Sequence, residues 1–471
     1  MLPHFFCTFA PINQHNIIMA TKERANFGSR LGIILATAGS AVGLGNVWRF
    51  PTMAGENGGG AFILCYILCV LLLGVPCMLG EFVIGRRAQA NAARAYHTLA
   101  GRGPWRFIGY FGVFTGFLIA SYYCVVSGWC LQYVYASVAG QVSGSPDYVT
   151  SYFNDFVSNP WKPLVWLVLF FLISHFVVVR GVEKGIERAS KLMMPLLFIL
   201  LVTIAVASCL LPGASRGFKF LFSPDFSKID GNVLLGALGQ AFYSLSLGMG
   251  CLCTYASYFS RDTHLAKSAF QIAGIDTLIA ILAGLMIFPA VFSVGGDVGA
   301  GPSLVFITLP NVFSQAFSSV PWLGQIIALL FYLLLSVAAL TSLISLHEVC
   351  TAFFHEEFQL SRAKAATIVT SLCCVLGIFC SLSFYDADTL SLFGKSLFDL
   401  FDFATGQIFL PLGGFLTCLF LGWFVPKHII SDEITNQGTL SGRFVGLFIF
   451  SLRFFCPACI LLIFLHQMGA L

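Results

Sequence analysis

"GSAVGLGNVWRFP", residues 39–51, lies inside the first long apolar segment of this 471-residue chain. Three of its residues are glycines, and each glycine in a helix interior costs about 1 kcal/mol relative to alanine. The stretch also carries Asn46 and Arg49, although a charge near the centre of a bilayer costs at least ~2.5 kcal/mol. The segment is therefore either not a membrane helix or a membrane helix whose interruption has a function.

The composition places this segment in a bilayer. Hydrophobic residues make up 58% of the chain and charged residues only 10%, whereas soluble proteins carry roughly 25% charged residues. Apolar runs of about 20 residues match a helix that crosses the hydrocarbon core, and the short alternating strands of a barrel fit none of them. We predict an all-α polytopic membrane protein with eleven spans, at residues 28–52, 60–83, 107–139, 163–180, 190–211, 232–259, 266–295, 321–354, 364–384, 396–425 and 444–466.

The basic residues in the loops and at the span ends predict the orientation, because cytoplasmic loops carry more Lys and Arg. With a cytoplasmic N-terminus, eighteen of them fall on the cytoplasmic side and five on the other side. We expect the protein in the cell membrane (the inner or plasma membrane). The odd number of spans then places its C-terminus on the extracytoplasmic side. The charges are dispersed over loops, so no nucleic-acid groove is predicted and the lipid bilayer is an expected partner.

A cytoplasmic leader, residues 1–27, precedes the first span. Residues 1–18 lack the basic region and the cleavage site of a signal peptide. Two interpretations stay open: translation starts at Met19, or the leader is disordered.

Nothing in the sequence pattern indicates an enzyme or a metal centre. Most of the 16 cysteines lie inside apolar runs, where we interpret them as small hydrophobic residues. No cysteine or histidine spacing typical of a metal site is apparent. His347 and Glu348 are adjacent in one span and therefore point to different faces of a helix.

A second interruption lies in the sixth span, in "GQAFYSLSLGMGCLCTYASY", residues 239–258, where serines and glycines cluster at the centre. Close packing of small residues explains one such cluster. Two interruptions that lie five spans apart favour an inverted repeat with a binding site at the midplane. Half-helix N-termini suit a carboxylate, and freed carbonyls with Asn, Ser and Thr oxygens suit a hard cation such as Na⁺. The implied substrate has an anionic end and travels with a cation.

Six segments resemble the signatures of the neurotransmitter:sodium symporter family, in family order and over nearly the whole chain. They are "RLGIILATAGSAVGLGNVWRFPTMAGENGGGAF" (30–62), "GVPCMLGEFVIGR" (74–86), "RGVEKGIE" (180–187), "SLSLGMG" (244–250), "ALTS" (339–342) and "DFATG" (402–406). The resemblance, to the bacterial amino-acid:sodium symporter branch, implies two five-helix halves, 28–211 and 232–425, related by a pseudo-two-fold axis in the membrane plane. An eleventh helix, 444–466, follows, where many relatives have twelve helices.

The resemblance implies two sodium sites. The first takes the substrate carboxylate together with the Ala41 carbonyl, Asn46, Ser244 and Asp276. The second takes the carbonyls of Gly39, Val42 and Ala338 and the hydroxyls of Thr341 and Ser342. Alternatively, these two hydroxyls bind no ion and donate to backbone carbonyls of the preceding turn of their own helix.

Asp276 is a lone acid in an apolar span, and its desolvation requires a partner. Many relatives have Asn at this position together with a chloride ion, or an acid one helical turn later. Here the residue one turn later is Ala280. Asp276 can therefore supply the negative charge itself, and we predict chloride-independent transport.

The resemblance also implies a substrate site, with main-chain atoms of residues 41–45 and 243–246 meeting the amino and carboxyl groups. The Tyr123 hydroxyl would bind the carboxylate. Met249 is an adaptable side chain between two glycines and Tyr243 replaces an expected Phe, which favours tyrosine or tryptophan without excluding leucine-like substrates. The complete set is Ser40, Ala41, Leu44, Gly45, Ile119, Tyr123, Tyr243, Ser244, Ser246, Met249, Ser342 and Leu346.

Two gates complete the prediction, each with an ion pair and an aromatic pair. The outer gate consists of the ion pair of Arg49 with Asp402 and the lid formed by Tyr123 and Tyr243. The cytoplasmic gate consists of the ion pair of Arg24 with Glu356 and the aromatic pair of Phe27 and Tyr258. The alternative for each ion pair is a surface salt bridge worth ~0–1 kcal/mol.

Together these features predict a sodium-coupled symporter that imports a hydrophobic or aromatic amino acid by alternating access, as a monomer or homodimer. Two alternatives remain. A cation channel would show polar stripes along several spans, and a non-transporting amino-acid sensor would carry a soluble output domain.

Overall fold

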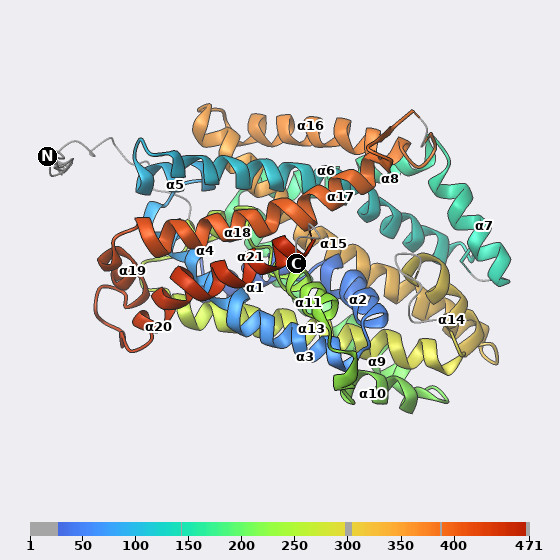
Figure 1. Ribbon diagram of the computed structural model, residues 1–471. Coiled ribbons are helices and arrows are strands. Elements are labelled where there is room, and N and C mark those ends of the chain that lie inside the picture. Colours follow the sequence, from blue (N-terminus) through green and yellow to red (C-terminus); the bar gives the residue numbers. More distant parts are fainter. Residues whose placement is uncertain (1–26, 143, 297–303, 387–388, 468–471) are drawn as a thin grey trace, which may run out of the picture.

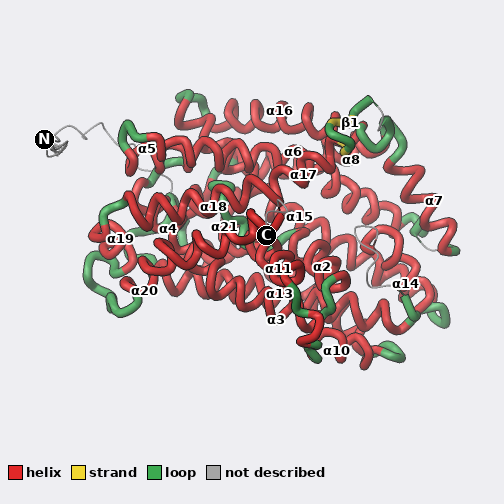
Figure 2. The backbone as a smooth tube through the Cα atoms, viewed as in Figure 1, coloured by secondary structure: helices red, strands yellow, loops and turns green. Residues whose placement is uncertain are grey.

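Long apolar helices lie side by side along one axis of the molecule (Figure 1). The computed structural model describes residues 27–142, 144–296, 304–386 and 389–467. Most of them are helical (Figure 2), and the only sheet in these ranges is the antiparallel pair β1 (Ser391–Leu392) and β2 (Lys395–Ser396). The prediction of an all-α protein is confirmed.

Single turns of π- or 3₁₀-helix join several of the helices end to end. In chain order the α-helices are α1 (Arg30–Ala41), α2 (Phe50–Glu56), α3 (Gly60–Cys69), α4 (Val75–Ala88), α5 (Ala92–Ala100), α6 (Phe107–Val138), α7 (Pro146–Val157), α8 (Lys162–Val179), α9 (Arg188–Cys209), α10 (Ala214–Phe222), α11 (Gly231–Ser244), α12 (Cys251–Ala256), α13 (Leu265–Ser293), α14 (Leu309–Ala316), α15 (Pro321–Glu357), α16 (Arg362–Leu382), α17 (Leu397–Phe403), α18 (Leu410–Leu419), α19 (Lys427–Ile434), α20 (Val445–Phe450) and α21 (Cys456–Gln467).

Nine continuous helices of the described residues are long and apolar enough to cross a bilayer. They are Gly60–Ala88, Pro104–Val138, Lys162–Val179, Val182–Cys209, Leu265–Ser293, Pro321–Glu357, Arg362–Leu382, Leu397–Phe424 and Val445–Leu462. A further span is formed by Arg30–Ala41 and Gly45–Glu56, which are bent by 51° at their break. The remaining predicted span, 232–259, corresponds to α11 and α12, which residues 245–250 separate. The polytopic architecture is confirmed.

Polar side chains begin several of these helices where the loops end. Ser29 accepts the N–H of Gly32 at the start of α1, and Asp230 accepts the N–H of Val233 at the start of α11, at 3.0 and 2.8 Å. Such caps satisfy backbone donors that have no partner within the helix. The loops also contain the short helices α5, α7, α10, α14 and α19, which the hydropathy pattern does not predict because they do not cross the bilayer.

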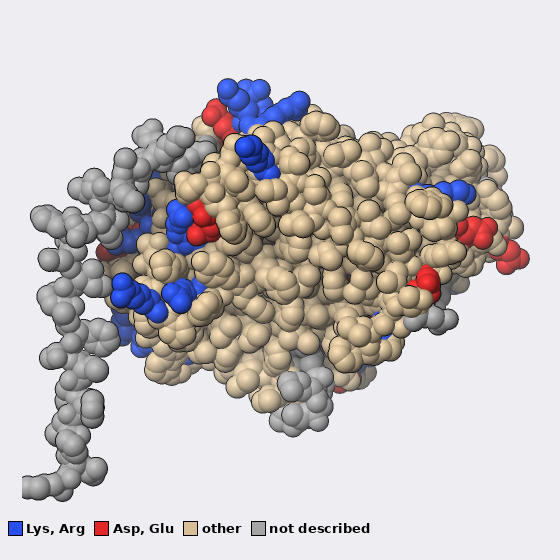
Figure 3. All heavy atoms as spheres, turned by 90° about the horizontal axis from the view of Figure 1, so that it is seen from above, with Lys and Arg blue, Asp and Glu red and all other residues tan. Residues whose placement is uncertain are grey.

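The 37-residue α15 lies at the centre of the bundle and packs against α1, α6, α8, α9 and α16. Uncharged side chains cover a broad middle band of the face in Figure 3, and Lys and Arg gather at the end of the molecule where α5 and α19 lie. A band without charges is expected for a surface that contacts lipid, because charged side chains are costly in hydrocarbon.

Candidate functional site at the two broken helices

The first break separates α1 from α2. Val42 leaves the helical conformation with φ −77° and ψ 109°, and a π-helical turn, Gly45–Arg49, begins the second half. The Val42 carbonyl lies between the two halves and meets the Thr341 hydroxyl, whereas the Gly43 carbonyl accepts the N–H groups of Asn46 and Val47. The second break follows α11, where Ser246, Gly248 and Gly250 have φ values of 55°, 80° and 74°. Glycine adopts this left-handed conformation without the steric cost that a Cβ imposes.

Asn46, Ser244 and Asp276 meet between the two breaks, and all three are at most 1% exposed. Asn46 Nδ2 lies 2.7 Å from Asp276 Oδ1 and 3.0 Å from Ser244 Oγ. The Ser244 hydroxyl lies 2.9 Å from both carboxylate oxygens. Tyr66 of α3 donates its hydroxyl to Asp276 Oδ2 at 2.9 Å. The structure therefore brings together the three side chains predicted for the first sodium site and adds Tyr66, which sequence reasoning missed.

A second group of oxygens lies where α15 passes the first break. Thr341 Oγ1 lies 3.0 Å from the Val42 carbonyl and 2.8 Å from the Ala338 carbonyl. Ser342 Oγ lies 3.3 Å from the Val42 carbonyl. A Cβ added at Gly39 would come within 3.5 Å of Thr341 Cβ, so Gly39 also lies beside this group. The five residues predicted for the second sodium site are thus neighbours.

Both groups consist of oxygen donors that suit a hard cation. The first group includes a buried carboxylate, whose negative charge is stable at this depth only with a partner. The second group is uncharged and consists of carbonyl and hydroxyl oxygens. Gln240 of α11 donates to the Gly45 carbonyl at 2.8 Å and thereby ties the two broken helices together. The sequence signal for these two contacts was a polar residue inside an apolar span, Tyr66 beside Asp276 and Gln240 beside Gly45.

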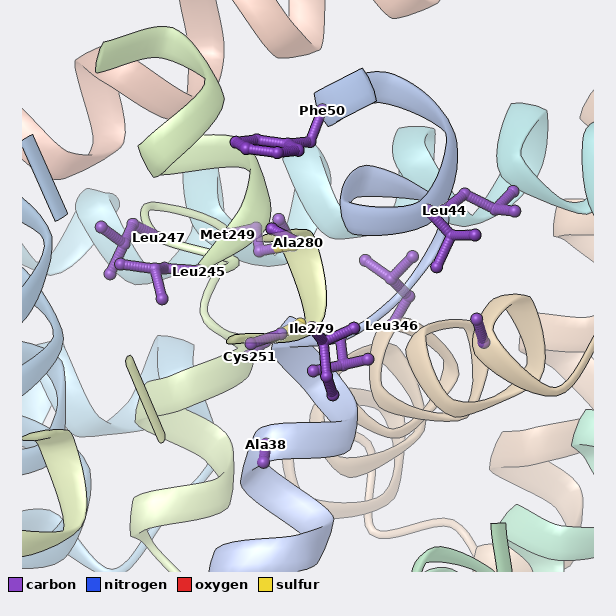
Figure 4. Close-up of a cluster of buried hydrophobic side chains, with 14 of the residues drawn as sticks. Ala38, Leu44, Phe50, Leu245, Leu247, Met249, Cys251, Ile279, Ala280 and Leu346 are labelled. Atoms are coloured by element: carbon purple, nitrogen blue, oxygen red, sulfur yellow. The ribbon is translucent and has the colours of Figure 1, made fainter. Parts of the chain in front are cut away.

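A central pocket of about 30 Å³ lies between the breaks and the helices α6 and α15. Its wall contains ten of the twelve residues predicted for substrate. Leu44 and Ser244 are not part of the wall, and Gly43 and Cys251 are additional members. Figure 4 shows Met249 and Cys251 at the unwound segment between α11 and α12. The pocket wall comprises Ser40, Ala41, Gly43, Gly45, Ile119, Tyr123, Tyr243, Ser246, Met249, Cys251, Ser342 and Leu346.

Tyr123 and Tyr243 separate this pocket from a larger cavity of about 480 Å³, the vestibule, because both line the two cavities. The Tyr123 hydroxyl accepts the N–H of Leu44 at 3.1 Å, so α6 is tied to the first break. The two tyrosines occupy the place of the predicted lid.

Arg49 and Asp402 both line the vestibule, but no ion pair within 4.0 Å joins them in the structure of the described residues. The guanidinium carbon of Arg49 instead lies 4.4 Å from the centre of the Tyr243 ring. Asp402 accepts a hydrogen bond from Tyr122 at 3.3 Å. The vestibule is therefore wide enough to keep the predicted partners apart.

The opposite end of the site is closed by packed aromatic and charged groups. The ring of Phe27 meets Tyr258 edge to face at 6.1 Å between centroids. Arg24 lies outside the described residues, and Glu356 accepts the N–H of Asn91 at 2.8 Å.

A second ion pair at this end was missed by sequence reasoning. Arg362 of α16 is bound to the fully buried Glu348 of α15, and Tyr258 donates to the same carboxylate at 2.7 Å. The sequence around Glu348 does not indicate this pair, because its partners Arg362 and Tyr258 come from other parts of the chain.

The chain is similar to known proteins over nearly its whole length. The profile of the Sodium:neurotransmitter symporter family matches residues 24–146 and 149–471. The chain is 38% identical to the uncharacterized sodium-dependent transporter YhdH of Bacillus subtilis, over 96% of this chain and 100% of that protein. It is 36% identical to an uncharacterized sodium-dependent transporter of Haemophilus influenzae, over 95% and 99% of the two chains. The crystal structure of MhsT in complex with L-phenylalanine superposes with a TM-score of 0.87 at 45% identity, covering 95% of this chain and 100% of that one.

Proposed function

Since this chain belongs to the sodium:neurotransmitter symporter family, we propose that it couples the inward movement of sodium to the import of a hydrophobic or aromatic amino acid. It is a sodium-dependent membrane transporter by family, and not an enzyme. The observation that carries the proposal is the central pocket, which lies between two groups of oxygen donors and below a pair of tyrosines. MhsT, at 45% identity, holds L-phenylalanine, which supports an amino acid as the substrate.

The proposed binding mode places the substrate between the two breaks. Its carboxylate would meet the Tyr123 hydroxyl and the first sodium ion, which Asp276 and Asn46 hold from the other side. The second sodium ion would lie between Val42, Ala338 and Thr341. The first sodium ion then has two carboxylates beside it, which compensate the buried charge, whereas the second is held by the oxygen dipoles of carbonyl and hydroxyl groups.

Alternating access follows from the two sides of the pocket. We assign the vestibule to the outer side and the Phe27 end to the cytoplasm, which agrees with the basic residues in the loops near α5 and α19. In the described conformation the vestibule is wide and the cytoplasmic side is closed by Phe27, Tyr258 and the Glu348–Arg362 ion pair. Pairing of Arg49 with Asp402 and separation of the cytoplasmic contacts would complete the cycle. Each ligand shifts this equilibrium only by its different affinity for the two conformations.

Sodium replacement tests the proposal directly. Proteoliposomes with the purified protein should accumulate radiolabelled tryptophan, tyrosine, phenylalanine or leucine when an inward sodium gradient is applied. Replacing Na⁺ by K⁺ or choline should reduce uptake to that of protein-free vesicles, because neither cation fits the compact oxygen groups. Uptake that is independent of the cation contradicts symport. Sodium currents without substrate accumulation indicate a channel, and binding without any flux indicates a sensor.

Met249→Phe should narrow the range of substrates. Met249 is 4% exposed and lines the central pocket between Gly248 and Gly250, so its flexible side chain can yield to a large substrate. A rigid ring that overfills a packed site costs about 1–3 kcal/mol, or roughly 5- to 150-fold in affinity. Tryptophan and tyrosine should lose this affinity in competition uptake, whereas alanine and leucine should bind about as before.

The matched control is Met286→Phe, because Met286 is buried in α13 and does not line the pocket. It should affect all substrates alike. An unchanged tryptophan affinity in Met249→Phe would remove the main support for the aromatic preference.

A further inference from the structure

Three cysteines from distant parts of the chain meet within the bundle. Cys77 lies on α4, Cys418 on α18 and Cys456 at the start of α21. All three are buried, and their sulfur atoms lie within 4.8 Å of one another. Cys77 and Cys418 are 341 residues apart in the chain, yet their sulfur atoms are separated by 3.4 Å. The absence of a metal-ligand spacing in the sequence therefore does not exclude a metal site, because the ligands come from three separate spans.

The sulfur triangle has the dimensions of a metal–thiolate site. Three sulfur atoms bound at ~2.3 Å in tetrahedral directions lie about 3.8 Å apart, within the range from 3.4 to 4.8 Å found here. A disulfide requires a sulfur–sulfur distance of about 2.05 Å, and all three cysteines are free. We propose that Cys77, Cys418 and Cys456 bind one thiophilic metal ion with a filled d shell, such as Zn²⁺, Cd²⁺ or Cu⁺.

One polar side chain contacts the triangle, and a buried acid lies one helical turn from it. Ser451 Oγ lies 3.3 Å from Cys456 Sγ. Glu81 lies one helical turn after Cys77 on the same face of α4 and is 3% exposed. Its Oε1 accepts the N–H of Gly248 at 2.7 Å, whereas Oε2 has no hydrogen-bond partner within the part of the chain that is described.

Metal binding displaces the protons of the three thiols. When the metal ion binds, each thiol exchanges its S–H bond for a metal–sulfur bond and releases one proton. The three protons leave to solvent. No electron is transferred, so the step requires no oxidant.

The bound ion would join three separate helices. α4 belongs to the first half of the chain, α18 to the second half, and α21 is the last helix. α18 packs against both α4 and α21, so one ion can contact all three without moving them apart. Through Glu81 and Gly248 the metal site would also be coupled to the unwound segment of the substrate pocket.

Cadmium titration of the reduced, metal-stripped full chain in detergent tests the proposal. We expect one saturable Cd²⁺ equivalent per chain with a thiolate-to-cadmium absorbance in the ultraviolet. Cys418→Ser should weaken binding more than ~100-fold, since loss of even an outer-shell partner costs about 10- to 100-fold. Cys130→Ser is the matched control, because Cys130 is also 0% exposed but lies on α6. It should bind Cd²⁺ as the wild type does.

X-ray absorption of the cadmium-loaded wild type should show three sulfur ligands, and this measurement does not depend on how a variant folds. Absence of saturable binding, fewer than three sulfur ligands, or equal losses in both variants would overturn the proposal. The proposal would also be overturned if Cys77 and Cys418 form a disulfide and the protein still binds no metal after this disulfide is reduced. Transport is not measured in any of these experiments, so their outcome is independent of the proposed symport.

Discussion

Asp276→Asn should abolish sodium-driven uptake in chloride-free medium and make the remaining activity depend on chloride. Asp276 is 0% exposed and is in contact with Asn46, Ser244 and Tyr66. Removing one partner of a buried charge pair costs about 3–5 kcal/mol, which corresponds to roughly 100- to 5000-fold in sodium affinity. Asparagine keeps the size of the side chain, so the loss of sodium affinity measures the effect of removing the negative charge.

Chloride should restore part of this loss. The hydroxyls of Tyr66 and Ser244 donate to the Asp276 carboxylate in the described structure. Once that carboxylate is neutral, the same donors are available to an anion, which would again balance the charge of sodium.

The measurement is uptake against sodium concentration, with gluconate or chloride as the anion. Asp399→Asn is the control for a general effect of losing an acid, because Asp399 also lies near the pocket but lines only the vestibule. It should remain chloride-independent. A wild type that requires chloride, or an Asp276→Asn variant indifferent to it, contradicts the assignment of Asp276 as the permanent counter-charge.

Gly248→Ala should eliminate transport and destabilise the protein. Gly248 has φ +80°, and an added Cβ would lie 2.4 Å from the Leu410 carbonyl oxygen and 3.0 Å from the Gly414 nitrogen. Both obstacles are backbone atoms of α18, which cannot rotate away. The left-handed conformation costs alanine about 1–2 kcal/mol, and overpacking adds about 1–3 kcal/mol.

Gly239→Ala is the matched control for this change. Gly239 lies in the helical part of the same span, and a Cβ there would meet nothing within 4 Å. Alanine in a helix is favoured by about 1 kcal/mol over glycine, so stability should be kept or slightly raised. Thermal unfolding in detergent and uptake in proteoliposomes measure both effects. Normal uptake and stability of Gly248→Ala would mean that the close approach of the two helices is not required.

The sequence by itself determined the class of the protein and the location of its special segments. The low content of charged residues and the long apolar runs can be satisfied only in a bilayer, because they leave too little polar surface for a soluble fold. The glycines at 43, 45, 248 and 250 marked the breaks, because their local conformational freedom is a property of the residue itself. Asp276 was recognisable as functional because a lone acid in an apolar span is costly wherever the helix lies.

Only the tertiary structure decided which side chains meet across helices. Tyr66 donates to Asp276, which lies 210 residues later in the chain, and Glu348 pairs with Arg362 on the next helix. Cys77 contacts Cys418, which is 341 residues away in the sequence. Arg49 lies over Tyr243 rather than beside Asp402, because the width of the vestibule depends on how the two halves of the chain pack. Hydropathy and local spacing describe each helix along its own axis. The rotation and separation of neighbouring helices come from the packing of their side chains, and no single span contains that information.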